Sequence, residues 1–270
     1  MHAVIAHVGA FPAEELLFWC LIVVGPVLGG GLYVRGMAVL PGAYHRGRRF
    51  VAFAGGMVLL MAIFAPPVDE MVDSLFSIHM AQHMVLIVAV PVLFTYSRAF
   101  RFMMMGVPRD TRRLLYPLRR RSRAWLRWST LPFATAVFAV ALWIWHVPDL
   151  YDLAVENTMV HLVEHATLLG AGFLLWVGVM DPRRGFLPRS ISVFGTAFHS
   201  GLLGALLVLA PEVLYRSHLN QTLVSISPLQ DQQLAGLIMW IPMGGVFLAT
   251  LAVMIIRILD GADPGVVADV

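Results

Sequence analysis

The stretch 75-LFSIHMAQHMVLIVAVPVLFTYS-97 decides the fold, because it is apolar over 23 residues and contains no Asp, Glu, Lys or Arg. A helix rises 1.5 Å per residue, so about 20 apolar residues cross the roughly 30 Å hydrocarbon core of a bilayer. The whole chain of 270 residues is 59% hydrophobic and only 13% charged. This composition indicates a membrane protein and excludes both a soluble globular enzyme and a disordered chain.

The chain contains six further apolar runs that are each candidates for a membrane-spanning helix. The sequence therefore predicts an all-α, polytopic membrane protein with seven transmembrane helices in a single domain over residues 1–270. The second and fourth runs are short but lie between clear neighbours. The expected spans are 16–34, 50–65, 75–97, 131–147, 158–180, 191–211 and 233–259.

The basic residues predict the orientation of these spans. All 19 are arginines, and 18 of them fall in 35–49, 98–130, 181–190 and at Arg257, against Arg216 alone on the other side. Because positive loops stay in the cytoplasm, we expect the N-terminus outside and the C-terminus inside. The net charge of +3 is thus a topology signal and not one for nucleic acid. The segment 98–130 is interpreted as a topology determinant, with anionic lipid or an acidic partner as the alternative.

Five of the ten histidines fall at similar depth near the outer ends of the expected spans. They are His79 and His83 in HMAQH, His146, and His161 and His165 in HLVEH. Residues at i and i+4 share one helix face, so each pair presents two imidazoles along one stripe. The two pairs lie at roughly 6–12 Å depth if the helices rise 1.5 Å per residue. If the helices are neighbours, the five imidazoles converge in one outward layer.

Such a layer favours a metal site, because ionisable groups inside a membrane are usually functional and neutral imidazole is a metal ligand. Thioether with imidazole suits copper, especially Cu(I), so Met80 and Met84 are possible additional ligands, although packing is the simpler explanation for each of them taken alone. Gln82 and Glu164 flank the two pairs and could orient the rings. A structural hydrogen-bond network, proton transfer, and haem held between two facing histidines remain alternatives.

The remaining histidines carry less information. For His199, near the middle of the sixth span, packing and ligation are equally compatible with the sequence. By default His2, His7, His45 and His218 are expected to be solvated. Cys20 is the only cysteine, and GxSxG, P-loop and GxGxxG motifs are absent from the sequence. We therefore expect no disulfide framework and no enzymatic centre of those kinds.

The last span opens with a start signal, Ser227-Pro228-Leu229-Gln230, which matches a capping box with proline at the first helical position. Asp231, Gln232 and Gln233 follow in its first turn. A carboxylate there complements the helix dipole. The functional alternative is that Asp231 faces the histidine layer.

Three segments, HMAQHMVLIVAVPVL, WIWHVPDLYDLAVENTMVHLVEH and SPLQDQQLAGLIMWIP, resemble the signature segments of the CtaG-type cytochrome c oxidase assembly factors. The resemblance covers about residues 50–257. It departs from the family at Val90-Pro91-Val92, where a double proline is expected. It implies a seven-span protein of the bacterial cytoplasmic membrane that holds or supplies copper for an oxidase subunit, without turning over a substrate. By position it carries over His79, His83, His146, His161, His165, Asp231, Gln232 and Gln233.

Two hypotheses of different class follow. The first is an assembly factor, a metallochaperone whose outward histidine layer binds copper and passes it to a cytochrome c oxidase subunit. The second is a membrane redox enzyme or haem protein that uses the same histidine pairs. Copper transport is a weaker third reading, because beyond His199 the sixth span offers little polar path.

Overall fold

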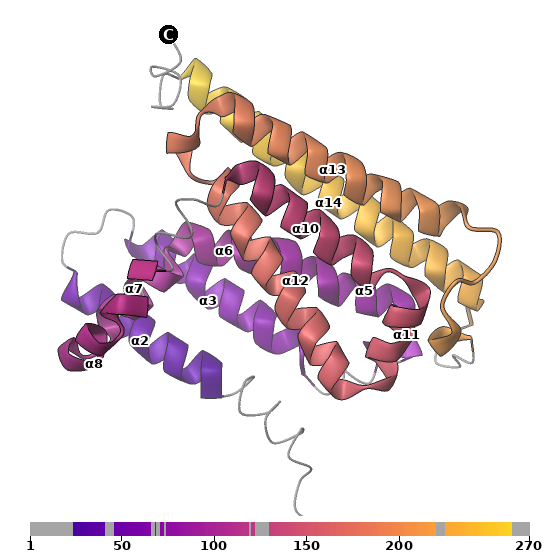
Figure 1. The fold of residues 1–270 in the computed structure, drawn as a ribbon, viewed down its shortest axis with the longest axis horizontal. Coiled ribbons are helices and arrows are strands. Elements are labelled where there is room, and N and C mark those ends of the chain that lie inside the picture. Colours follow the sequence, from indigo (N-terminus) through magenta and orange to yellow (C-terminus); the bar gives the residue numbers. More distant parts are fainter. Residues whose placement is uncertain are drawn as a thin grey trace, which may run out of the picture.

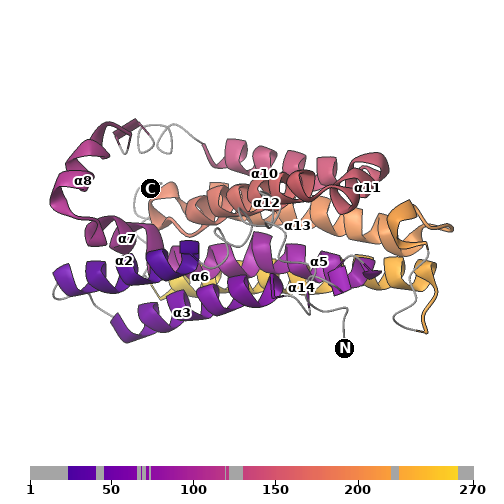
Figure 2. The ribbon, with the colours of Figure 1, turned by 90° about the horizontal axis from the view of Figure 1, so that it is seen from below.

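A computed structural model describes residues 24–40, 46–65, 68, 71–72, 74–118, 120–121, 130–219 and 225–260. These residues form helices and short connections, and none of them belongs to a strand. His2, His7, His45 and residues 16–23 of the first expected span lie outside this described part. In Figure 2 the helices form two layers, with α10, α12 and α13 in one and α2, α3, α5, α6 and α14 in the other.

The chain runs through helices of very different length (Figure 1). In order they are α2 (Gly25–Val39), α3 (Arg46–Ile63), α5 (Phe76–Met84), the π-helical η2 (Val85–Ala89), α6 (Val90–Ser97), α7 (Ala99–Gly106), α8 (Arg109–Leu114), α10 (Leu131–Trp145), α11 (Pro148–Glu156), α12 (Thr158–Val179), η3 (Pro182–Arg184), α13 (Phe186–Leu209), η4 (Arg216–His218) and α14 (Pro228–Leu259).

Four of these helical stretches are long and apolar enough to cross a membrane by themselves. They are Phe76–Ser97, Thr158–Val179, Phe186–Leu209 and Pro228–Leu259, and they match the third, fifth, sixth and seventh expected spans. The fourth expected span forms α10, which bends by 75° into α11. With this pair the described residues hold up to five candidate spans. The count of seven and the orientation of the termini stay predictions.

The described residues of the arginine-rich segment 98–130 are mostly helical and do not form a simple loop. The segment begins with Arg98 in the left-handed region, at φ 55°, and continues into α7 and α8. Helix α7 packs along α2. Residues 119 and 122–129, with Trp125 and Trp128, lie outside the described part, so the role of this segment stays a hypothesis.

The apolar side chains divide into a packed interior and an exposed surface. Helix α14 packs on both α13 and α5, and α12 packs on α10 and η2. Phe138, Trp176 and Phe247 are almost completely buried between these helices. Phe194 and Leu248 instead expose 68% and 69% of their surface on α13 and α14. Large apolar side chains this exposed are expected where the surrounding solvent is lipid.

The third expected span is interrupted by a π-helical turn that proline explains. Pro91 has no N–H, so the carbonyl of Ile87, four residues earlier, lacks its helical donor. The indole Nε1 of Trp176 on α12 donates to this carbonyl at 3.0 Å. The proline at residue 91 thus leads to a contact between two spans, because a neighbouring helix pairs the freed backbone group.

Gly172 permits the close approach of α12 to this turn. A Cβ atom at residue 172 would lie 2.7 Å from the Ile87 oxygen and 3.0 Å from its Cα. We expect Gly172→Ala to destabilise the protein by about 1–3 kcal/mol, as overpacking does in tight interiors. Thermal unfolding in detergent measures this. Gly170→Ala is the matched control, because a Cβ there meets nothing within 4 Å. Equal unfolding temperatures for the two variants would contradict the prediction.

Candidate metal centre

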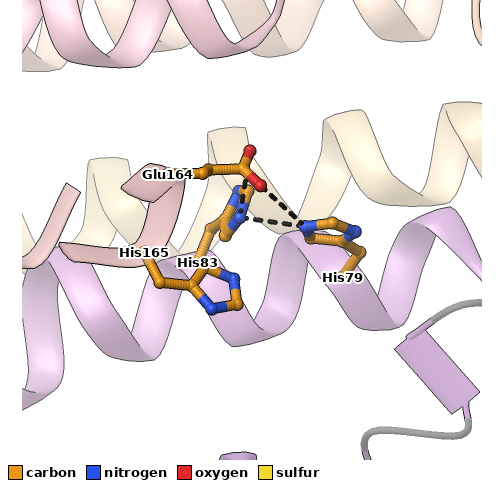
Figure 3. Close-up of side chains that lie close together, drawn as sticks. All are labelled: His79, His83, Glu164 and His165. Atoms are coloured by element: carbon orange, nitrogen blue, oxygen red, sulfur yellow. Dashed lines mark hydrogen bonds and ion pairs between the residues drawn. The ribbon is translucent and has the colours of Figure 1, made fainter. Parts of the chain in front are cut away.

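Two helices bring four buried ligand side chains together (Figure 3). Helix α5 supplies His79 and His83 from one face, as their spacing predicts, and α12 supplies Glu164 and His165. One ligand atom from each of the four lies within 4.8 Å of the others. The two Nε2 atoms of His79 and His83 are 3.0 Å apart. Glu164 reaches both rings, at 3.6 Å from His79 Nε2 and 3.5 Å from His83 Nε2.

The other two predicted imidazoles lie at the edge of this group. The His161 ring centroid is 4.1 Å from that of His165 and 5.0 Å from that of His79. His146, at the end of α10, has its ring centroid 6.3 Å from that of His83. The helices are therefore neighbours, and the five imidazoles expected in one layer do converge.

Several atoms of this group have no hydrogen-bond partner among the described residues. They are Nδ1 of His83, Nε2 of His161, Nε2 of His165 and both carboxylate oxygens of Glu164. Buried polar atoms are usually paired, and imidazole nitrogens and carboxylate oxygens are atom types that can bind a metal. A metal about 2.0–2.1 Å from two imidazole nitrogens places them roughly 3 Å apart when they are adjacent ligands. The His79–His83 separation fits this requirement.

Tyr151 and His218 join the site, although the sequence analysis names neither as a site residue. The Tyr151 hydroxyl lies 2.8 Å from Nδ1 of His79 and 2.8 Å from Nε2 of His218. The expectation that His218 is solvated is wrong, because its side chain is buried. Asp152 accepts hydrogen bonds from the backbone N–H groups of Arg216 and Ser217, and so holds the η4 turn against α11.

This hydrogen-bond chain can set the tautomer of His79. If Nδ1–H of His79 donates to the Tyr151 oxygen, the Tyr151 O–H donates onward to His218, and Nε2 of His79 keeps its lone pair for the cluster. Burial lowers the pKa of His218 from its ordinary value, which favours the neutral ring that accepts this hydrogen bond. Tyr151 could have been found from the sequence, because it lies in the segment WIWHVPDLYDLAVENTMVHLVEH that resembles the family. His218 could not, because no spacing rule connects it to His79, 139 residues earlier.

Asp231 contacts the first turn of α5, the helix that carries His79 and His83. Its carboxylate accepts hydrogen bonds from the backbone N–H groups of Phe76 at 2.7 Å and Ser77 at 3.2 Å. These N–H groups begin α5 and have no partner within the helix. The capping box at Ser227 and Gln230 is confirmed, and it positions the first turn of α14.

The other secondary candidates have different neighbours. Gln232 accepts a hydrogen bond from the backbone N–H of Leu214 at 2.7 Å and so secures the connection from α13 to α14. Gln82 donates to the Ile63 carbonyl at 2.8 Å and so joins α5 to α3. Gln233 is half-buried. His199 packs against Phe138, with ring centroids 6.1 Å apart, and is not part of the four-residue group.

The two methionines differ in their surroundings. Both belong to the hydrophobic core, as the packing interpretation expects. Met80 is fully buried, and its Sδ in addition lies 3.3 Å from Nε2 of His146. Only the three-dimensional structure distinguishes these two residues, which lie one helical turn apart.

Fold and site together define an all-helical membrane protein with a buried imidazole–carboxylate cluster between its helices. The chain belongs to the cytochrome c oxidase caa3 assembly factor family (Caa3_CtaG), whose model matches residues 31–260. This confirms the resemblance seen in the sequence segments. No curated protein and no solved structure matches the chain.

Proposed function

We propose that this protein assists assembly of a haem–copper cytochrome c oxidase by holding copper in the cluster of His79, His83, Glu164 and His165 and passing it to an oxidase subunit. The observation that carries the proposal is the convergence of these four buried side chains within 4.8 Å, with several ligand atoms unpaired in the described part of the chain. Membership of an assembly-factor family supplies the oxidase as the recipient.

The donor set suits a cargo ion. Neutral imidazoles enter a low-dielectric interior without the cost of a buried charge, and they are good ligands for copper. The Glu164 carboxylate, placed between two of the rings, can balance part of the charge of the ion. Under the expected orientation, with seven spans in the bacterial cytoplasmic membrane, the cluster lies toward the outer side. Copper would then pass laterally to an oxidase site at similar depth.

Elemental analysis and a visible spectrum of the purified protein test this proposal together. We expect copper up to about one equivalent per chain, directly or after incubation with copper, and no Soret band. A Soret band would instead support the haem or redox alternative, in which the same histidines hold iron. Protein that retains no copper after incubation and desalting would refute the copper proposal.

A further inference from the structure

Beside the carboxylate-containing cluster lies a second pair of potential metal ligands, Met80 and His146. Met80 is fully buried on α5, and His146 is buried at the end of α10. The Met80 Sδ and the His146 Nε2 are 3.3 Å apart. The two residues are 66 positions apart in sequence, so the contact joins α5 to the end of α10, and each side chain is directed at the other.

The hydrogen bond of the other ring nitrogen, Nδ1 of His146, shows whether a proton lies between Nε2 and the Met80 sulfur. Nδ1 of His146 lies 2.6 Å from the carbonyl oxygen of Leu142. A carbonyl only accepts, so Nδ1 carries the proton, and a neutral imidazole then has a bare Nε2. Thioether sulfur also offers lone pairs and no proton. Two ligand atoms therefore face each other with no hydrogen between them.

A soft cation placed between His146 Nε2 and Met80 Sδ can accept the lone pairs of both atoms. With metal–nitrogen and metal–sulfur distances of about 2.0 and 2.3 Å, a ligand–metal–ligand angle near 100° separates the two ligand atoms by roughly 3.3 Å. This is the separation observed between His146 and Met80. Thioether ligands select Cu(I), whereas carboxylate oxygen suits harder ions.

His83 belongs to the Glu164 cluster and also approaches His146 of this pair. Its Nε2 faces His79 at 3.0 Å, and its ring centroid is 6.3 Å from that of His146. Its Nδ1 is buried and has no hydrogen-bond partner in the part of the chain that the structure describes. His83 is thus the imidazole that both positions can share.

We infer that the protein has two adjacent copper positions, an imidazole–carboxylate position at Glu164 and a separate thioether–imidazole position at Met80 and His146 that selects Cu(I). The inference rests on the proposed function, because it assigns the oxidation state of the same cargo. His83 connects the two positions, so a Cu(I) ion can pass between them without a change of oxidation state and without leaving the buried layer.

Met80→Leu and Met84→Leu form a matched pair for the test. Both substitutions keep side-chain volume and apolar character, which proteins tolerate well. Cu(I) affinity is measured anaerobically against a chromophoric chelator, and Cu(II) affinity is measured separately in air. We expect Met80→Leu to weaken Cu(I) at least about 10-fold and to leave Cu(II) unchanged, whereas Met84→Leu changes neither. Glu164→Gln should show the reverse preference and weaken mainly Cu(II).

X-ray absorption at the copper edge supplies a second, structural readout. We expect the Cu(I)-loaded protein to show one sulfur ligand near about 2.3 Å, which disappears in Met80→Leu and persists in Met84→Leu. Equal Cu(I) affinities for the two variants, or Cu(I) bound without sulfur, would overturn this inference and leave the proposed function standing. Protein that binds neither oxidation state would overturn both.

Discussion

Copper should be lost from the His79→Ala/His83→Ala double variant, and cytochrome c oxidase activity should fall with it in cells that carry only this variant. The two imidazoles supply half of the four-residue group and face each other at 3.0 Å. Loss of groups that merely orient ligands already costs 10–100-fold in metal affinity, so we expect a decrease of more than about 100-fold here. The measurements are copper per chain by elemental analysis and oxidase activity of the membranes.

His199→Ala is the control for this variant. It removes one intramembrane imidazole that packs on Phe138 and is not part of the four-residue group. We expect it to keep its copper, and both proteins should elute as the wild type does in size-exclusion chromatography. Unchanged copper in a folded double variant would show that the site assignment is wrong.

Asp231→Ala should have the largest effect on stability, about 3–5 kcal/mol. The fully buried carboxylate pairs the backbone N–H groups of Phe76 and Ser77. Hydrogen bonds to a charged group contribute about 1.5–3 kcal/mol each, and a buried donor left without a partner adds its desolvation cost. Because these bonds hold the first turn of α5, copper retention should fall together with the unfolding temperature.

Two variants calibrate this effect. Asp231→Asn keeps one acceptor oxygen and should lose about half as much stability. Gln233→Ala changes a half-buried side chain in the same turn and should stay within about 0.5 kcal/mol of the wild type. Thermal unfolding in detergent micelles compares all three. If Asp231→Ala unfolds at the same temperature as Gln233→Ala, the carboxylate does not stabilise α5.

Sequence alone determined the features that depend on local pattern. An apolar run of about 20 residues has one stable form in lipid, because its backbone groups must be paired within the helix. The stretches 75–97 and 158–180 were therefore recognisable as candidate spans. The helical period of 3.6 residues placed His79 beside His83, and His161 beside His165, without any knowledge of their neighbours. The capping box at Ser227 is equally local.

The tertiary structure decided which of these local features meet. Glu164 turned out to contact two rings directly, Tyr151 joined His79 to His218, and Asp231 paired with the start of a helix 155 residues away. Met80 and Met84 have the same chemistry and both lie in the hydrophobic core, and the structure shows that the Met80 sulfur also contacts the His146 imidazole. Such contacts depend on how helices pack and bend, and helix packing angles follow from many side chains at once rather than from spacing along the chain.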